Sequence, residues 1–241
     1  MNDLFSIKGK IALITGAGSG IGAAIAEGFE EVGAVVFRGN HHLNKKTEVE
    51  PLVYQLDIED SKSRSKLMKE IHSRYGKLDI LVNAVGITFP GYSKVDWDRT
   101  LKVNLTSVYD MCNYAKYFME LNGGSIINIT SINANMAGSN NPAYNVSKAG
   151  LELLSKSIAK DWAKNNIRVN NLTLGYFKTK MTQKSQDDPI EYKKRCERIM
   201  INRFGDVSEV IGPAIFLASD ASSYITGSNI IVDGGFSSNG I

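Results

Sequence analysis

Three polar side chains in the second half of the chain have the types and spacing of an acid/base site. Tyr144 and Lys148 stand four positions apart in the stretch NPAYNVSKAGL (141–151), and Ser131 precedes Tyr144 by thirteen positions. A phenol has a pKa of about 10, but a lysine four residues further along a helix lies on the same face, and its ammonium favours the phenolate. We therefore expect Tyr144 to exchange a proton with a carbonyl or alcohol oxygen that Ser131 holds.

Each of these residues also has a structural interpretation. A tyrosine and a lysine at this spacing are common on exposed helix faces, and Ser131 could cap the next helix. Asn104, a fourth candidate, could satisfy backbone groups in a helix bend. The interpretation as a site depends on these residues occurring together behind a nucleotide-binding loop.

Such a loop is predicted near the start of the chain. The apolar run KIALITG (10–16) leads into TGAGSGIGAAIAEGF, which opens a helix. Gly16 permits a tight turn, Gly20 lets the backbone approach a ligand, and Gly22 permits close helix packing. Since the helix N-terminus offers free N–H groups to a pyrophosphate, the loop suits a dinucleotide.

Strands and helices that would position these groups alternate along the chain. Continuous apolar runs predict strands buried on both faces, as in a parallel sheet, at 10–16, 35–37, 52–57, 78–86, 125–131, 167–175 and 229–235. Helical periodicity follows the glycine loop, and Gly33 should end that helix; 41–51 leaves room for a turn or two of helix at most. The pattern predicts an α/β fold, a single domain (1–241) with a Rossmann-type doubly wound parallel sheet of about seven strands and helices on both faces.

The glycine spacing T-G-x-x-x-G-x-G resembles that of the short-chain dehydrogenase/reductase family. Asp57 after the third strand matches the family's adenine-contacting aspartate, and NAVG (83–86) is similar to its N-N-A-G motif. NNLTLGYFKT (170–179) resembles the family's nicotinamide-holding turn, although Leu174 stands where Pro is usual, and YITGSNIIVDGG (224–235) resembles its last strand. The four catalytic positions of the family are occupied by Asn104, Ser131, Tyr144 and Lys148.

The resemblance implies hydride transfer between a nicotinamide cofactor and a carbonyl or secondary alcohol. Lys148 would also hold the nicotinamide ribose, and Asn104 would fix a water that relays protons to Lys148. The residues expected to contact the cofactor are Gly16, Ser19, Gly20, Ile21, Gly22, Asn40, Asp57, Ile58, Asn83, Ala84, Gly86, Tyr144, Lys148, Gly175, Phe177 and Thr179. The family usually forms tetramers through the helices that follow Asn104 and Tyr144, so we expect a homo-oligomer; Leu153 and Trp162 could serve that interface or the core of the monomer.

The end of the second strand bears on the choice between NAD and NADP. In the family an acid there binds the ribose 2′-hydroxyl, and a nearby arginine receives the 2′-phosphate. Asn40 aligns with either position, depending on one deletion, and no carboxylate is present to repel a phosphate. The positive surroundings favour NADP(H) over NAD(H) and comprise Arg38, His41, His42, Lys45 and Lys46. Against it, Ser19 stands where many NADP-preferring members have Arg or Lys, Arg38 could face away, and the histidines and lysines could form a solvated turn.

The composition excludes several other classes. Apolar residues make up 43% and charged residues 22%, as in ordinary globular proteins, and a scattered net charge of +3 gives no sign of nucleic-acid binding. No segment has the roughly 18 apolar residues of a membrane span and none resembles a signal peptide, so we expect a cytoplasmic protein without membrane partners. Cys112 and Cys196 are isolated and read as reduced thiols, and the three histidines have no ligand spacing, so no metal is expected.

The polar segment 181–204 follows a glycine-marked strand end and predicts a mobile lid. With 87–92, 133–141 and Tyr176, it should wall the substrate pocket. The amide-rich stretch NANMAGSNN (133–141) favours a polar, hydroxylated small molecule such as a sugar, sugar acid or polyol. One alternative is a 3-oxoacyl thioester, whose acidic carrier or phosphate would bind Lys184, Lys193, Lys194 and Arg195. An alternative of another class is a non-catalytic NAD(P)-binding regulatory protein.

Overall fold

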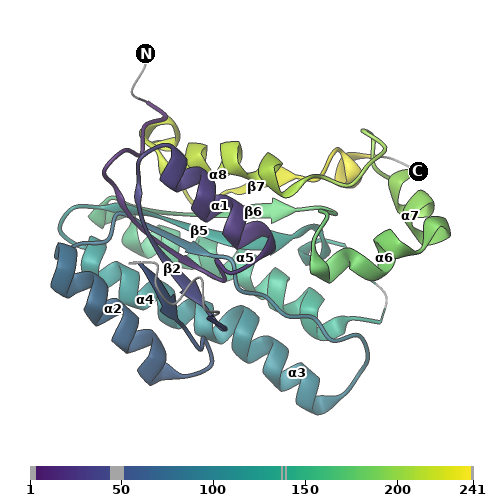
Figure 1. The fold of residues 1–241 in the computed structure, drawn as a ribbon, viewed down its shortest axis with the longest axis horizontal. Helices are drawn as coiled ribbons and strands as arrows, with labels where there is room; N and C mark the ends of the chain where they lie inside the picture. Colours follow the sequence, from purple (N-terminus) through teal and green to yellow (C-terminus); the bar gives the residue numbers. More distant parts are fainter. Residues whose placement is uncertain (1–3, 44–51, 137, 139, 240–241) are drawn as a thin grey trace.

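A parallel sheet of seven strands forms the centre of the protein (Figure 1). The computed structural model describes residues 4–43, 52–136, 138 and 140–239. The strands lie in the order β3-β2-β1-β4-β5-β6-β7, and every neighbouring pair is parallel. Their bounds are β1 Ile11–Thr15, β2 Val35–Asn40, β3 Val53–Gln55, β4 Ile80–Asn83, β5 Gly124–Ser131, β6 Ile167–Leu174 and β7 Asn229–Val232. The predicted doubly wound sheet is confirmed.

Helices cover both faces of the sheet (Figure 1). On one face lie α1 (Gly20–Glu31) and α8 (Ile211–Ala218), and on the other lie α2 (Ser61–Tyr75), α4 (Ser107–Met119) and α5 (Pro142–Trp162). The short α3 (Lys94–Leu101) packs against α5. All five residues of β1 are buried, and alternate side chains enter opposite cores. Leu13 packs in the core beneath α2, α4 and α5, and Ile14 packs in the core beneath α1 and α8. This two-sided burial explains why the strands read as continuous apolar runs.

Two sequence predictions about the first helices have different outcomes. Gly33 does end the first helix: α1 stops at Glu31, and Gly33 has a φ of +87°, which suits glycine. The prediction for 41–51 falls mainly on 44–51, which lie outside the described residues.

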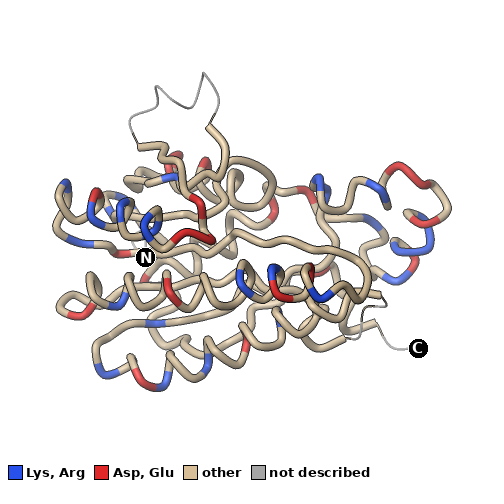
Figure 2. The backbone as a smooth tube through the Cα atoms, turned by 90° about the horizontal axis from the view of Figure 1, so that it is seen from below, with Lys and Arg blue, Asp and Glu red and all other residues tan. Residues whose placement is uncertain are grey.

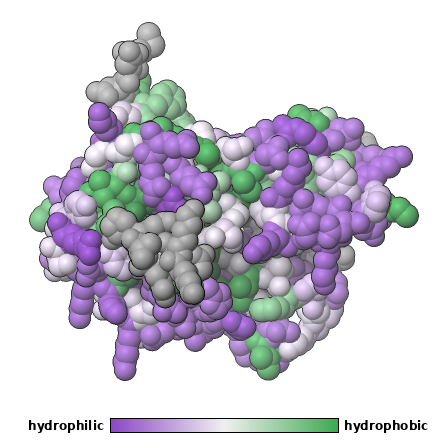
Figure 3. All heavy atoms as spheres, viewed as in Figure 1, coloured by the Kyte–Doolittle hydropathy of each residue, from purple (hydrophilic) through white to green (hydrophobic). Residues whose placement is uncertain are grey.

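The segment 181–204 contains two short helices, α6 (Gln183–Asp187) and α7 (Pro189–Cys196). Asp188 caps α7 by accepting the N–H groups of Ile190 and Glu191. Cys196 and Ile199 are buried in a small apolar cluster that includes Phe204, whereas α6 has no buried residue. Figure 3 shows a mainly hydrophilic surface over both helices. The helical periodicity of this segment is weak because only these few residues are buried. The mobility of the segment stays a prediction.

The strand order reverses at β1, which has β2 on one side and β4 on the other. Chain connections leave the two halves of the sheet in opposite directions at such a point, so a crevice forms beyond the carboxyl ends of the strands. The glycine loop follows β1 directly, and the NAVG stretch continues from β4. The topology therefore brings two of the predicted cofactor motifs to the same edge of the sheet.

A continuous chain of buried hydrogen bonds crosses the second half of the sheet. The Asn83 amide on β4 donates to Asn128 on β5 at 2.8 Å, and Asn128 donates to the Ser155 hydroxyl on α5 at 2.8 Å. Ser155 bonds the side chain of Asn171 on β6 at 2.7 Å, and Asn171 donates to Asn229 on β7 at 2.7 Å. Four strands are thus tied to α5 through side chains that are buried, except for the half-buried Asn229.

The chain ends at the carboxylate of Glu152, which is only 5% exposed. One carboxylate oxygen accepts from the amides of Asn229 at 2.7 Å and Asn135 at 3.0 Å. The other oxygen accepts from the Thr130 hydroxyl at 3.2 Å and from the Thr173 hydroxyl at 3.1 Å. Burial of a charge requires such donors, and here they come from β5, β6, β7 and the loop after β5.

Replacing Glu152 by Leu should lower the free energy of unfolding by roughly 3 kcal/mol, because buried donors on four segments lose their acceptor. Urea unfolding measures the difference. Lys160→Ala, at an exposed position near the end of the same helix, is the matched control and should change stability by less than about 0.5 kcal/mol. Equal stability of Glu152→Leu and the wild type would contradict the role given to this carboxylate.

Candidate active site

The glycine loop turns as its sequence predicts. Gly16 and Gly20 adopt φ values of +73° and +58°, and a Cβ at Gly22 would lie 2.3 Å from the carbonyl oxygen of Gly16. A larger residue at 22 would therefore push α1 away from the loop. Ser19 precedes α1 without capping it through its side chain, and the first turn contains no acidic residue. The first N–H groups of α1 are thus left for an external acceptor, as at an anion-binding helix N-terminus.

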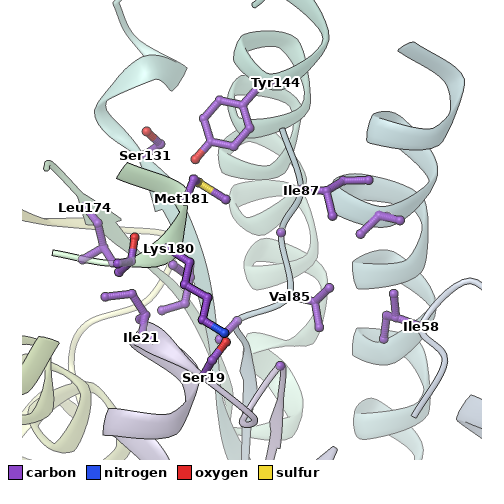
Figure 4. Close-up of a pocket in the computed structure, with 18 of the residues that line it drawn as sticks. Ser19, Ile21, Ile58, Val85, Ile87, Ser131, Tyr144, Leu174, Lys180 and Met181 are labelled. Carbon is purple, nitrogen blue, oxygen red and sulfur yellow. The ribbon is translucent and has the colours of Figure 1, made fainter. Parts of the chain in front are cut away.

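A cleft of about 510 Å³ lies at the carboxyl ends of the strands. It joins the glycine loop to the acid/base residues, which are far apart in the sequence (Figure 4). The predicted site residues that line it are Gly16, Ser19, Gly20, Ile21, Gly22, Asp57, Ile58, Ala84, Gly86, Ser131, Tyr144, Lys148, Gly175, Phe177 and Thr179. The structure therefore brings most of the predicted set around one cavity.

Three predicted residues do not line this cleft: Asn40, Asn83 and Asn104. Asn40 ends β2 and packs against the glycine loop, since a Cβ at Gly18 would lie 3.3 Å from its Cγ. Asn40 is 3% exposed, and its Oδ1 has no hydrogen-bond partner among the described residues. The Asn83 side chain points into the core, where it begins the chain of buried hydrogen bonds. Its spacing could not reveal this, because its partner lies on a different strand.

The hydroxyl groups of Ser131 and Tyr144 point toward one another inside the cleft (Figure 4). Ser131 is the last residue of β5, and Tyr144 lies in the first turn of α5. Ser131 also accepts the backbone N–H of Asn133 at 3.2 Å and so caps the short turn that follows. The structural and the chemical interpretations of Ser131 are therefore compatible.

Burial raises the pKa of Tyr144 above its ordinary value, and the hydrogen bond with Ser131 opposes this effect. The Lys148 ammonium lies 5.7 Å from the centre of the Tyr144 ring and donates to the carbonyl of Ile129 at 2.8 Å. The lowered pKa expected from the sequence is therefore wrong for this arrangement, because the loss of solvation dominates. A phenol with a raised pKa keeps its proton at neutral pH, as a proton donor must.

Lys148 is itself buried and only 4% exposed. Burial lowers the pKa of its ammonium to about 8, because no carboxylate compensates for the lost water. Its Nζ lies next to the NAVG stretch, since a Cβ at Gly86 would be in ordinary contact with it at 3.5 Å. The cleft thus contains an ammonium that is close to its titration range.

Asn104 lies behind the cleft wall, in a π-helical turn (Lys102–Thr106) that links α3 to α4. Its side chain accepts the N–H of Ile87 and donates to the carbonyl of Ile87, both at 2.9 Å. It also donates to Ser147 at 3.1 Å. Asn104 therefore satisfies backbone groups at a helix bend, and the same contacts hold the wall beside Lys148. Its role in binding a water stays a prediction.

Two asparagines of the amide-rich loop use their amides within the protein. Asn135 donates to Glu152, and Asn141 donates to the hydroxyl of Thr88 at 2.6 Å. These side chains therefore give no independent support for a hydroxylated substrate. Of the predicted pocket walls, Ile87, Met181 and Thr182 line the cleft, whereas Tyr176 stacks on Phe204 with ring centres 5.2 Å apart.

Other lining residues were not singled out as site residues by sequence reasoning. Arg99 enters the cleft beside Glu59, with which it forms an ion pair at 3.2 Å. Lys180 also lines the cleft. Its position directly after the predicted cofactor residue Thr179 is the one feature of the sequence that could have indicated this. The remaining members of this group are Leu56, Val85, Val103, Ile129, Thr130 and Leu174, and His41 was considered only for cofactor choice.

Cys112 and Cys196 are buried and free, and burial raises the pKa of the Cys112 thiol to about 12. Within the described ranges, no group of three or more His, Cys, Asp or Glu residues could hold a metal ion. In the same part of the chain, no helix combines the length and apolarity needed to cross a membrane.

The residues present fit a dinucleotide. The uncapped N-terminus of α1 can accept a diphosphate, and a side chain at Gly16 would collide with the backbone at Val85, 3.0 Å from its Cβ. Ser131 and Tyr144 stand further along the same cleft, with Lys148 beside them. This combination defines a nicotinamide-dependent oxidoreductase.

Comparison with known proteins gives the family. The family model described as enoyl-(acyl carrier protein) reductase matches residues 16–237. The chain is 36% identical over 245 residues to 2-dehydro-3-deoxy-D-gluconate 5-dehydrogenase from Dickeya dadantii, covering 96% of this chain and 97% of that protein. It is also 36% identical over 245 residues to 3-oxoacyl-(acyl-carrier-protein) reductase from Thermotoga maritima, covering 95% and 98%. The crystal structure of a gluconate 5-dehydrogenase from Burkholderia cenocepacia in complex with NADP and tartrate has a TM-score of 0.91 at 32% identity, covering 98% of both chains.

The chain therefore belongs to the short-chain dehydrogenase/reductase family, and it is an NAD(P)-dependent oxidoreductase acting on CH–OH groups. The resemblance stated from the motifs is confirmed. The match covers nearly the whole chain and nearly the whole length of these relatives.

Replacing Lys148 by Met should stabilise the ligand-free protein near pH 7 by about 3 kcal/mol, since burial lowers the lysine pKa from 10.5 to about 8. Below pH 8 the lysine is charged in both the folded and the unfolded protein, so the folded protein bears the full free-energy cost of burying the charge. Between pH 8 and 10.5 only the unfolded chain keeps the proton, so the wild type gains stability as pH rises and the difference shrinks.

Urea unfolding of both proteins at several pH values measures this difference. Lys160→Met changes an exposed lysine on the same helix and is the control. A stability difference that does not depend on pH would show that the burial of Lys148 is not its cause.

Proposed function

We propose that the protein is an NADP(H)-dependent oxidoreductase that interconverts a keto group and a secondary alcohol of a sugar acid. The observation that carries the proposal is the convergence of the Ser131 and Tyr144 hydroxyls in the cleft that begins at the glycine loop. A regulatory protein that only binds a dinucleotide does not need a half-buried phenol and a buried ammonium at this place. The non-catalytic alternative is therefore disfavoured.

In the direction of reduction, the substrate carbonyl oxygen lies between Ser131 and Tyr144 and accepts a hydrogen bond from each. The bound nicotinamide supplies hydride to the carbonyl carbon. Tyr144 gives its proton to the oxygen as negative charge develops there, and Ser131 stabilises that charge. In the direction of oxidation the same oxygen returns its proton to Tyr144.

Lys148 stabilises the phenolate that Tyr144 leaves behind, because its ammonium lies 5.7 Å from the ring in a site shielded from water. Asn104 acts through the wall segment at Gly86 and Ile87, which it holds beside Lys148. The family resemblance adds a contact from Lys148 to the nicotinamide ribose and a water at Asn104.

The cofactor would lie along the cleft from the glycine loop to Tyr144. The N–H groups at Gly20, Ile21 and Gly22 would hold the diphosphate. By the same family resemblance, Asp57 and Ile58 would flank the adenine. Gly175, Phe177 and Thr179 would flank the nicotinamide from the opposite wall.

Two relatives support a sugar acid as the substrate, since their names specify 2-dehydro-3-deoxy-D-gluconate and gluconate. The relative from Thermotoga maritima supports the alternative, a 3-oxoacyl thioester on an acidic carrier. The basic residues Lys184, Lys193, Lys194 and Arg195 on α6 and α7 outnumber the acidic Asp187 and Glu191. Figure 2 shows both signs of charge at this end of the molecule, and Arg195 pairs with Glu191 at 3.6 Å. Arg195 also donates to the Tyr176 hydroxyl at 2.7 Å. The basic end of α7 is compatible with an acidic carrier, and the sugar acid is the first choice because two of the relatives specify one.

The preference for NADP(H) rests on the end of β2 and on the NADP in the related crystal structure. Arg38 forms a two-point ion pair with Glu30 on α1, at 2.8 and 2.5 Å. His41 lines the cleft and is the candidate for the 2′-phosphate, next to the neutral Asn40. Lys45 and Lys46, the other basic residues considered, lie outside the described residues.

The cytoplasmic location and the tetramer stay predictions. Trp162 belongs to the core of the monomer, whereas Leu153 on α5 is 66% exposed. Exposed Tyr109 and Tyr117 on α4 and exposed Leu153 support an interface at these helices. Light scattering of the purified protein measures the number of subunits.

Replacing Tyr144 by Phe should lower kcat at least about 100-fold, because the proton donor is lost while the shape of the cleft is kept. NADPH binding, measured by calorimetry, should stay within about two-fold of the wild type. Oxidation of D-gluconate with NADP⁺ and reduction of a 3-oxoacyl thioester with NADPH provide the two assays. Turnover of the thioester alone would select the alternative substrate, and turnover by Tyr144→Phe at the wild-type rate would refute the mechanism.

Replacing His41 by Glu should raise the KM for NADPH roughly ten-fold and leave the KM for NADH unchanged, since a carboxylate at this place repels only the 2′-phosphate. His42→Glu is the matched control, because His42 adjoins His41 but does not line the cleft. A wild-type protein that prefers NADH would overturn the cofactor assignment.

A further inference from the structure

The turn that opens the segment 181–204 is tightly hydrogen-bonded. The Thr182 hydroxyl lies 2.5 Å from the carbonyl of Phe177, to which it donates, and it accepts the N–H of Thr179 at 3.2 Å. Gln186 on α6 donates to the carbonyl of Thr179 at 3.1 Å. The backbone around Lys180 is therefore held in one conformation by its own neighbours.

This turn meets the N-terminus of α1 across the cleft. A Cβ at Gly20 would lie 3.6 Å from the Thr179 side chain. Lys180 extends from the turn along the cleft wall, and its ammonium points toward Ser19 of the glycine loop (Figure 4). The ammonium thus points to the glycine loop and away from Tyr144.

Lys180 differs from the other cationic side chains nearby in having no partner. Lys178, two positions earlier, pairs with Asp206 at 2.8 Å. In the cleft itself, Arg99 pairs with Glu59 and Lys148 donates to Ile129. No ion pair or hydrogen bond of the Lys180 side chain exists within the described residues.

An ammonium beside an uncapped helix N-terminus forms a strong site for an anion. The first N–H groups of α1 and the positive end of its dipole face the same space as the ammonium, and no acidic residue in the first turn competes. Of the anionic groups of an NADP-dependent reaction, the diphosphate would lie nearest the glycine loop, the 2′-phosphate would lie at the end of β2, and a substrate carboxylate would lie near Tyr144.

We propose that Lys180 binds the diphosphate of the dinucleotide and thereby joins the base of the segment 181–204 to the N-terminus of α1. This inference rests on the proposed function. The charge-assisted contact forms only when the dinucleotide is present, so Lys180 contributes to cofactor affinity and not to the chemical step.

The experiment uses calorimetry to measure ligand affinities of the wild type, Lys180→Met and Lys178→Met in the same buffer. The ligands are NADPH, NADH, ADP-ribose, which has the diphosphate without nicotinamide, and 2′-AMP, which has the 2′-phosphate without the diphosphate. Lys180→Met should weaken NADPH, NADH and ADP-ribose by the same factor, roughly ten-fold, and leave 2′-AMP unchanged. Lys178→Met should bind all four like the wild type, and added KCl should weaken ADP-ribose less in Lys180→Met than in the wild type.

Unchanged affinity of Lys180→Met for ADP-ribose would overturn the assignment of Lys180 while leaving the proposed function intact. A loss confined to NADPH and 2′-AMP would also overturn it, because the ammonium would then serve the 2′-phosphate. If the wild type binds neither NADPH nor ADP-ribose, the proposed function fails, and the assignment of Lys180 fails with it.

Discussion

The chain of buried hydrogen bonds from Asn83 to Glu152 is the constraint on which the active site depends. Buried polar groups cost free energy unless they are bonded, so a network of this kind is compatible with few alternative registers. It ties β4, β5, β6 and β7 to α5. Since α5 carries Tyr144 and Lys148, and β5 ends at Ser131, the network determines how the three reacting groups face one another.

The burial of ionisable groups in the cleft lowers the stability of the fold but suits carbonyl reduction. Burial raises the pKa of Tyr144 and lowers that of Lys148, so each group is held in surroundings that disfavour its charged form. A phenol that keeps its proton and an ammonium that is ready to stabilise the phenolate are what carbonyl reduction requires. The large apolar cores on both faces of the sheet supply the stability that this arrangement lacks.

The sequence predicted most of the fold and most of the site, for local reasons. Strands that are buried on both faces appear as uninterrupted apolar runs, and the glycines of the loop are required by backbone geometry at Gly16, Gly20 and Gly22. The predictions that failed or weakened depended on partners elsewhere in the chain. The amide of Asn83 serves Asn128, the amides of Asn135 and Asn141 serve Glu152 and Thr88, and the pKa of Tyr144 follows its burial.

The sequence by itself determined the order of the strands along the chain and the dinucleotide loop, and it predicted the four residues of the catalytic set, because these follow from residue types and their order along the chain. The tertiary structure alone decided which polar side chains face the cleft and which are bonded in the core. It also decided that Lys180, and not Lys178, reaches the glycine loop. The reason is physical: solvation, charge pairing and hydrogen bonding depend on distances between segments, and those distances exist only after the sheet has formed.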